Sequence, residues 1–186
     1  MKKDISVSDL EASGYASIAA LTFIGILVGL HIYIWKERNF VSELSSLISA
    51  NFLIFLLILF IGYIIHALIQ GLTWQLLGNN KLNAIGYGIR RKDRGSVSFN
   101  AYCKEPMELK TYKIGIAMPG IILGILPAVL GIFTGNYLVF IFGLFGVLYS
   151  GENILVLWLL REVKADSLVK SHPKRVGFYV IDKNEG

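Results

Sequence analysis

Long apolar runs alternate with short polar segments along the chain, and this alternation indicates the class of protein. Four runs are long enough to cross a bilayer as helices, because the hydrocarbon core needs about 20 consecutive apolar residues. They cover approximately residues 15–35, 51–77, 112–134 and 137–160. The pattern therefore predicts a multi-pass membrane protein whose membrane domain, residues 15–160, contains four helices.

The polar segments between and beside these runs predict a small β-element. Residues 1–14 are expected to form a loose tail or an interfacial turn. Within the long polar loop 78–111, two β-prone stretches flank the charged turn Asp93-Arg94-Gly95, which is typical of a hairpin. The polar C-terminal tail, 161–186, contains one further β-prone stretch at 176–181. The expected fold class is an α-helical membrane bundle of about four spans with a small cytoplasmic β-hairpin.

The third run contains features that modify a simple span. Pro119 and Pro127 interrupt it, and prolines are tolerated in membrane helices when neighbouring groups satisfy the freed carbonyls. Gly120 and Gly124 are spaced four residues apart, which favours close contact with another helix. A three-span arrangement, in which one apolar run is re-entrant, is also compatible with the pattern.

Charge sets the expected orientation and partners. Only 17% of the residues are charged, against about 25% in soluble domains. Of the 18 lysines and arginines, all but Lys36 and Arg38 lie in the N-terminal tail, the long loop or the C-terminal segment, when Lys113 at the membrane edge is counted with the loop. The positive-inside rule then predicts a cell-membrane protein with both termini in the cytoplasm. The net charge of +5 favours anionic lipid of the bilayer, not nucleic acid, as the partner.

Two ionisable residues lie well inside predicted spans, where they are costly and are therefore candidates for function. His66 and Glu152 are roughly 16 and 13 Å from the cytoplasmic ends of their helices at the helical rise per residue, so they could meet. Gln70 and Thr73 continue the helix face of His66. These residues could form a site, but a His–Glu pair could also simply hold two helices together.

The remaining reactive side chains offer little chemistry. His31 is expected at the wet end of the first span in a structural role, and His172 is expected to be solvated in the tail. Cys103 is the only cysteine, which excludes an internal disulfide and a zinc site built from paired cysteines.

Residues 65–74, Ile-His-Ala-Leu-Ile-Gln-Gly-Leu-Thr-Trp, resemble the His-Glu-Leu-Ile-His-Gly-Leu-Thr-Trp segment of a family of bacterial membrane proteins. That family is described as zincin peptidases and is distantly similar to site-2 proteases. The likeness covers roughly residues 50–182. Its further pieces are 102–106, 117–120, 123–127, 150–153, 172–173 and 176–178.

The resemblance implies a zinc site that has lost essential groups. In the family motif His-Glu-x-x-His, two imidazoles bind zinc and the glutamate activates a metal-bound water. His66 matches the first histidine and Glu152 matches an acidic ligand in the last span. However, Ala67 stands at the general-base position, Gln70 at the second histidine, and Ser171 where an aspartate is expected. Zinc would then be held weakly by His66, Gln70 and Glu152, or be absent, and no catalytic residue is assigned.

Three functions fit these observations, so whether the protein is an enzyme stays open. It could be a catalytically impaired relative that binds a membrane peptide or a protein partner in the old cleft. It could be a residual zinc metallopeptidase acting on membrane peptides. It could also be a structural or accessory membrane subunit in which His66 and Glu152 only pair the helices.

Overall fold

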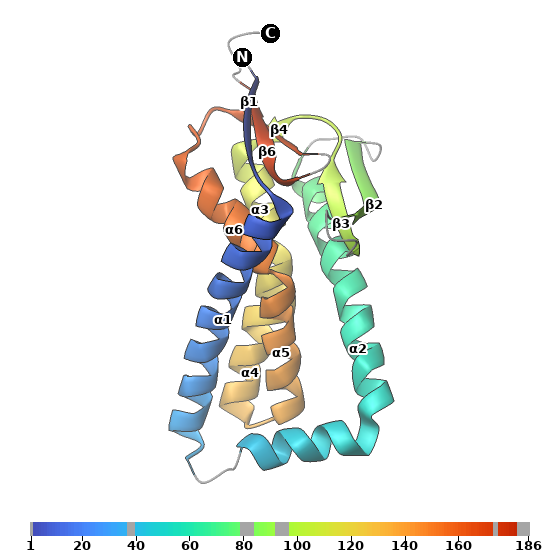
Figure 1. Ribbon diagram of the computed structural model, residues 1–186, viewed down its shortest axis with the longest axis vertical. Helices are drawn as coiled ribbons and strands as arrows, with labels where there is room; N and C mark the ends of the chain where they lie inside the picture. The colour runs from blue at the N-terminus through green and yellow to red at the C-terminus, as the bar shows by residue number, and fades with distance from the viewer. Residues whose placement is uncertain (1, 37–39, 79–83, 92–96, 173–174, 182–186) are drawn as a thin grey trace.

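The computed structural model describes residues 2–36, 40–78, 84–91, 97–172 and 175–181. A bundle of long helices forms one layer, and strands cover one end of it (Figure 1). The helical segments are α1 (Asp9–Ile34), α2 (Phe40–Leu77), α3 (Leu109–Pro119), a π-helical segment (Gly120–Ile125), α4 (Leu126–Thr134), α5 (Tyr137–Tyr149), α6 (Gly151–Leu159) and a 3-10 turn (Leu160–Glu162).

Three helical stretches are long and apolar enough to cross a membrane: Asp9–Ile34, Phe52–Leu77 and Leu109–Thr134. A fourth is present if the bent pair Tyr137–Tyr149 and Gly151–Glu162 counts as one span. The predicted fold class, a helical membrane bundle of about four spans with a small β-element, is confirmed. The alternative with a re-entrant segment corresponds to the same pair of helices, between which the chain bends by 47°.

The prolines of the third span widen the helix without ending it. Pro119 and Pro127 flank the π-helical segment, in which Leu126 N–H donates to the carbonyl of Ile121, five residues back. Proline has no N–H, so Pro127 cannot bond the carbonyl of Leu123 four residues earlier. Gly146 of α5 packs directly against this carbonyl, and the absence of a Cβ at Gly146 permits this close approach of α5.

The fourth span is not the straight helix that its apolar pattern indicates. It breaks at Ser150, whose N–H donates to the carbonyls of Gly146 and Val147 at the end of α5. Beyond the break, Gly151 packs against the backbone of Ala16 in α1. Helix α6 therefore leans toward α1, and Glu152 lies in its first turn.

The β-layer is larger than predicted. The hairpin is confirmed as β2 (Ile85–Arg91) paired with β3 (Val97–Cys103), although its Asp93-Arg94-Gly95 turn lies outside the described residues. A second sheet has the order β1-β6-β5-β4. Its strands are β1 (Lys2–Val7), β4 (Met107–Glu108), β5 (Leu168–Ser171) and β6 (Val176–Ile181). Strand β6 is the predicted C-terminal stretch, whereas β5 was not predicted.

The expectation of a loose tail at residues 1–14 is wrong. Strand β1 pairs with β6 over its whole length, from Lys2 opposite Ile181 to Val7 opposite Val176, and its apolar side chains Ile5 and Val7 pack on the core. Helix α1 then begins at Asp9, six residues before the predicted start, because Ser8 and Glu11 form a capping box. The sequence signal Ser-x-x-Glu was present at this position.

Two histidines are more enclosed than predicted. His31 is 1% exposed, not at a wet interface, because its ring packs on Tyr137 and Phe140 with centroids 4.8 and 4.4 Å away. The His172 side chain is only 9% exposed, and its ring lies against that of Tyr179, with centroids 4.8 Å apart. Its Nδ1 accepts the N–H of Arg175 at 2.8 Å, and its Nε2 lies 3.6 Å from a carboxylate oxygen of Asp4.

Candidate functional site

Helix α2 carries the predicted polar stripe on its buried face. His66, Gln70 and Thr73 are each less than a tenth exposed, and Ala67 beside them is fully enclosed. Thr73 bonds within its own helix, donating to the carbonyl of Ile69. Only His66 and Gln70 therefore direct their polar atoms toward other elements.

His66 bonds with the break in the fourth span. Its Nε2 lies 3.0 Å from the hydroxyl oxygen of Ser150, and that hydroxyl donates to the carbonyl of Gly146 at 2.9 Å. Which of the two atoms donates depends on the histidine tautomer. In either case the contact with Ser150 occupies Nε2 of His66, so a metal ion would have to displace Ser150 to bind this nitrogen.

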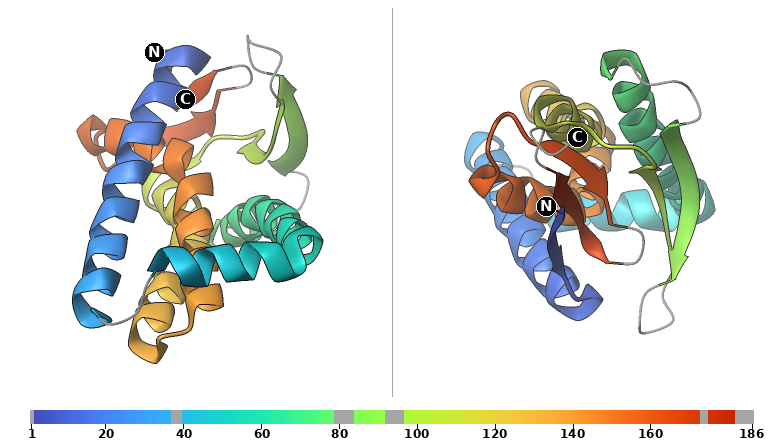
Figure 2. Two further views of the ribbon diagram at one scale, coloured as in Figure 1. Left: turned by 60° about the horizontal axis from the view of Figure 1, so that its bottom comes forward. Right: turned by 90° about the horizontal axis from the view of Figure 1, so that it is seen from above.

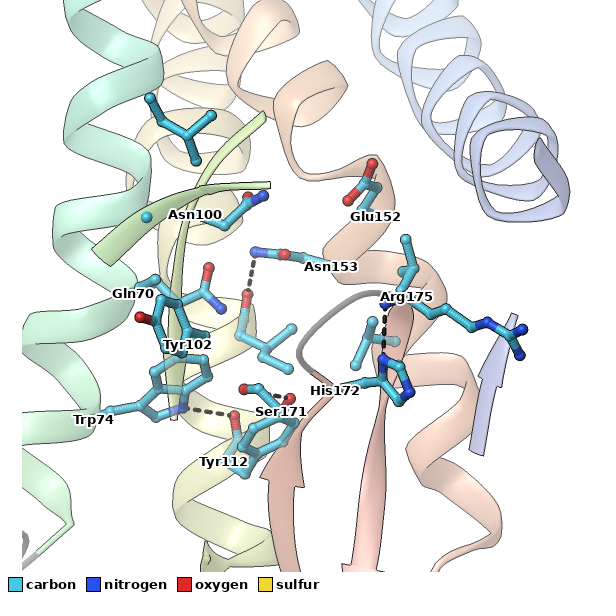
Figure 3. Close-up of a pocket in the computed structure, with 17 residues that line it drawn as sticks. Gln70, Trp74, Asn100, Tyr102, Tyr112, Glu152, Asn153, Ser171, His172 and Arg175 are labelled. Atoms are coloured by element: carbon cyan, nitrogen blue, oxygen red, sulfur yellow. Dashed lines mark hydrogen bonds between the residues drawn. The ribbon is translucent and has the colours of Figure 1, made fainter. Parts of the chain in front are cut away.

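A polar cavity of about 330 Å³ lies between the helices and the β-layer. Gln70 enters it from α2, Asn100 from β3, and Glu152 and Asn153 from α6 (Figure 3). Its other lining side chains that can form hydrogen bonds or stack are Trp74, Tyr102, Tyr112, Ser171, His172 and Arg175. The structure thus brings Gln70 and Glu152 to one cavity, while His66 lies one helical turn away against Ser150.

Helix α6 contributes two neighbouring residues to the cavity. The Asn153 side chain points into the cavity and donates from Nδ2 to the carbonyl of Ile116 at 3.0 Å (Figure 3). The Glu152 side chain lies above Asn153 in the view of Figure 3 and also lines the cavity.

Buried contacts among α2, α3, β3 and β5 fix the deeper part of the cavity wall. Trp74 stacks on Tyr112, with centroids 5.2 Å apart, and donates to its carbonyl at 3.1 Å. Ser171, which replaces the expected aspartate, accepts the N–H of Cys103 at 3.0 Å and lies 3.3 Å from the Tyr112 hydroxyl. Burial raises the pKa of the Cys103 thiol to about 12, so this cysteine is not a thiolate nucleophile at neutral pH.

The residues present do not fit a zinc ion. Catalytic zinc sites use three protein ligands drawn from imidazoles, thiolates and carboxylates. Here the family positions provide one imidazole bonded to Ser150, one carboxamide at Gln70 and one carboxylate at Glu152. Within the part of the chain that the structure describes, no three His, Cys, Asp or Glu side chains gather to hold a metal.

Several residues of the site had no sequence signal. Ser150, Asn153 and Asn100 are polar residues in or beside apolar stretches, and only their positions in the fold bring them to His66 or to the cavity. Ser150 and Asn153 did fall in a segment that resembles the family, next to Glu152. Asn100 lies on a strand of the hairpin, where alternation alone does not distinguish a cavity residue from a solvated one.

A bundle of membrane-length helices, with a cavity beside the buried histidine face of α2, fits a membrane protein of the zincin-like type. The family model described as "Putative zincin peptidase" matches residues 59–168, more than half of the chain. The chain belongs to this family. No curated protein and no solved structure matches it.

The His66–Ser150 bond leads to a first prediction. Replacing Ser150→Ala should lower the free energy of unfolding by about 1–3 kcal/mol, because a buried imidazole nitrogen loses its hydrogen-bond partner. The measurement is thermal or denaturant unfolding in detergent. Thr22→Ala is the matched control, since Thr22 bonds only the Ile18 carbonyl of its own exposed helix face. Equal losses in both variants would contradict a stabilising role for the His66–Ser150 bond.

Proposed function

We propose that this protein is a non-catalytic member of the zincin peptidase family that binds a segment of a membrane peptide or protein in its polar cavity. The main supporting observation is that the structure has a cavity at the family's site, although Gln70 contributes a carboxamide to it and Ala67 stands at the general-base position. No group at Ala67 can take a proton from water, and hydrolysis would need one.

The lining favours a peptide. Gln70, Asn100 and Asn153 each carry a carboxamide, which combines hydrogen-bond donors with an acceptor just as a backbone peptide group does. Trp74 and Tyr102 add aromatic surface for apolar side chains. A segment with unpaired N–H and C=O groups would therefore find complementary partners along this wall.

The same proposal includes a location. Helices of membrane length and the clustering of Lys and Arg outside the apolar runs support a multi-pass protein of the cell membrane with cytoplasmic termini. The β-layer and the mouth of the cavity would then lie on the cytoplasmic side, where a juxtamembrane segment of a partner could reach Gln70.

The test combines metal content, cleavage and binding. By elemental analysis, the purified protein should contain no more zinc than the His66→Ala variant does. It should also not cleave the neutral probe acetyl-(Ala-Ser)5-amide. It should bind this peptide, measured as a saturable rise in the unfolding temperature. A probe that is N-methylated at alternate residues should bind at least about tenfold more weakly, because half of its backbone N–H donors are missing.

Two variants separate the cavity from the rest of helix α2. Gln70→Leu should weaken binding of the neutral probe, whereas Gln75→Leu should not, because Gln75 does not line the cavity. One equivalent of zinc that is lost in His66→Ala, together with cleavage, would instead establish a residual metallopeptidase. Absence of binding with the natural cavity intact would favour the structural subunit.

A further inference from the structure

An apolar cavity of about 220 Å³ lies between α1, the third span and α6. Helices α1 and α6 lie on the side of the bundle away from α2 (Figures 1 and 2). Of the described residues, only Ile116 and Asn153 also line the polar cavity that Gln70 enters, so the two cavities are largely separate. The residues that line the apolar cavity include Phe23, Ala117, Ile121, Ile125, Ile154 and Leu157.

The wall of the apolar cavity consists of hydrocarbon. Among the described residues that line it, Ser150 and Asn153 are the polar ones. The Ser150 hydroxyl donates to the Gly146 carbonyl, and the Asn153 carboxamide donates to the Ile116 carbonyl. Both polar groups are thus bonded within the protein, whereas an ordered buried water needs roughly two to four polar partners. The cavity therefore suits a hydrocarbon chain better than water.

Part of the cavity lining is exposed where lipid would surround the protein. Phe23, Ile121 and Ile125 line the cavity and are between 43% and 46% exposed. All three lie in helical stretches that are long and apolar enough to cross a membrane, so acyl chains of the bilayer would contact them. An apolar cavity of about 150 Å³ is large enough to bind benzene. The present cavity therefore has room for a segment of one acyl chain.

A lysine lies on the cavity-lining face of α3. Lys113 precedes Ala117 by four residues and Gly120 by seven, and both of these residues line the cavity. This spacing places Lys113 on the same helix face, one turn closer to the β-layer. Within the described ranges, Lys113 forms no hydrogen bond or ion pair. Its ammonium group can therefore pair with an anion at the end of the cavity nearest the β-layer.

An exposed tryptophan marks the same level on α6. Starting from the bond between Asn153 and the Ile116 carbonyl, Lys113 and Trp158 lie three and five residues closer to the β-layer on neighbouring helices. Trp158 is 62% exposed, and tryptophans are enriched at the level of lipid headgroups. Arg161 stacks on its ring at 3.7 Å but already pairs with Glu162. Lys113 is therefore the cation that a headgroup would meet.

We propose that the apolar cavity and Lys113 form a binding site for one anionic phospholipid. A segment of an acyl chain fills the cavity, and the phosphate of the headgroup pairs with the Lys113 ammonium. Filling the cavity restores the dispersion contacts that its lining atoms lack, and the lysine selects a headgroup with net negative charge. The site is built from α1, α6 and the third span, and peptide binding in the polar cavity is not required.

The experiment adds three probes to the full chain in a neutral detergent. Dioleoyl phosphatidylglycerol should raise the unfolding temperature saturably, and native mass spectrometry should show one retained lipid per chain. Dioleoyl phosphatidylcholine has the same chains without net charge, and it should bind about fivefold more weakly. Glycerophosphoglycerol carries the anionic headgroup without chains, so it should neither stabilise the protein nor displace the lipid.

Two pairs of variants assign binding to the site. Lys113→Gln should weaken phosphatidylglycerol binding about fivefold. Its control is Lys104→Gln, since Lys104 is exposed in the connection between β3 and β4. Ala117→Leu should weaken binding of both lipids on the order of tenfold, because the larger side chain fills the cavity. Ala19→Leu is the matched control, because Ala19 does not line the cavity.

Four results would overturn the proposal. They are equal affinity for the two lipids, displacement of the lipid by glycerophosphoglycerol, unchanged affinity in Ala117→Leu, and a lipid-free dimer that Ala117→Leu dissociates. The last result would show that a second copy of the chain covers this face. The Ala-Ser peptide and Gln70→Leu report on the polar cavity alone. A failure of lipid binding is therefore distinguishable from a failure of the proposed peptide binding.

Discussion

The Gln70→His variant is expected to retain close to one equivalent of zinc per chain, whereas the natural protein retains none. The change would place a second imidazole one helical turn from His66 on the buried face of α2, which is the spacing that zinc requires of a helical His pair. Coordination by zinc would offset the loss of the His66–Ser150 bond, and Glu152, which lines the same cavity as Gln70, could supply a third ligand. Elemental analysis after gel filtration measures the occupancy.

Two further changes test whether zinc sits where the family places it. Gln75→His adds a histidine to the same helix away from the cavity, so it should not raise zinc content. Glu152→Gln in the Gln70→His background should lower the occupancy, because the carboxylate ligand is removed. Zinc retained equally by Gln75→His would contradict the assignment. Adding Ala67→Glu to Gln70→His then asks whether a general base restores peptide cleavage.

Replacing Gly146→Ala is expected to be the most destabilising change considered, with a loss of about 3 kcal/mol or more. A Cβ at this position would collide with the backbone of Leu123 and Gly124 in the π-helical segment. Neither partner can move cheaply, since both contacts involve backbone in packed helices. Thermal unfolding in detergent, with the fraction of folded protein after purification, measures the effect.

Gly25→Ala is the matched control for this prediction. Gly25 lies in α1, and a Cβ there would meet nothing within 4 Å, so alanine should be neutral or slightly stabilising through its helix propensity. Because Gly146 also supplies the carbonyl that Ser150 bonds, the Gly146→Ala variant should also disturb His66. Similar unfolding temperatures for Gly146→Ala and Gly25→Ala would show that α5 and the third span do not pack as closely as described.

These contacts explain how the fold can persist without the family's metal. In a zincin, the metal would tie the histidine helix to an acidic residue of the last span. Here Ser150, two residues before Glu152, bonds His66 and joins the same two segments. Gln70 and Glu152 both line the cavity beneath the hairpin.

The sequence alone determined the features that depend on local pattern. The lengths of the apolar runs predicted the helices, and the alternating stretches around 84–99 predicted the hairpin, because neighbouring residues carry both signals. The four-residue spacing of His66 and Gln70 likewise placed them on one helix face. The departures at Ala67 and Gln70 could also be read directly from the sequence.

Only the tertiary structure decided which polar groups meet. Strand β1 pairs with β6 across almost the whole chain, and His66 bonds Ser150 over 84 positions of sequence. Such contacts depend on the bend at Ser150 and on glycines that let backbones touch, neither of which has a local signature. Depth along the helices placed His66 and Glu152 at similar levels, but it could not reveal that His66 bonds Ser150 while Glu152 lines the cavity with Gln70.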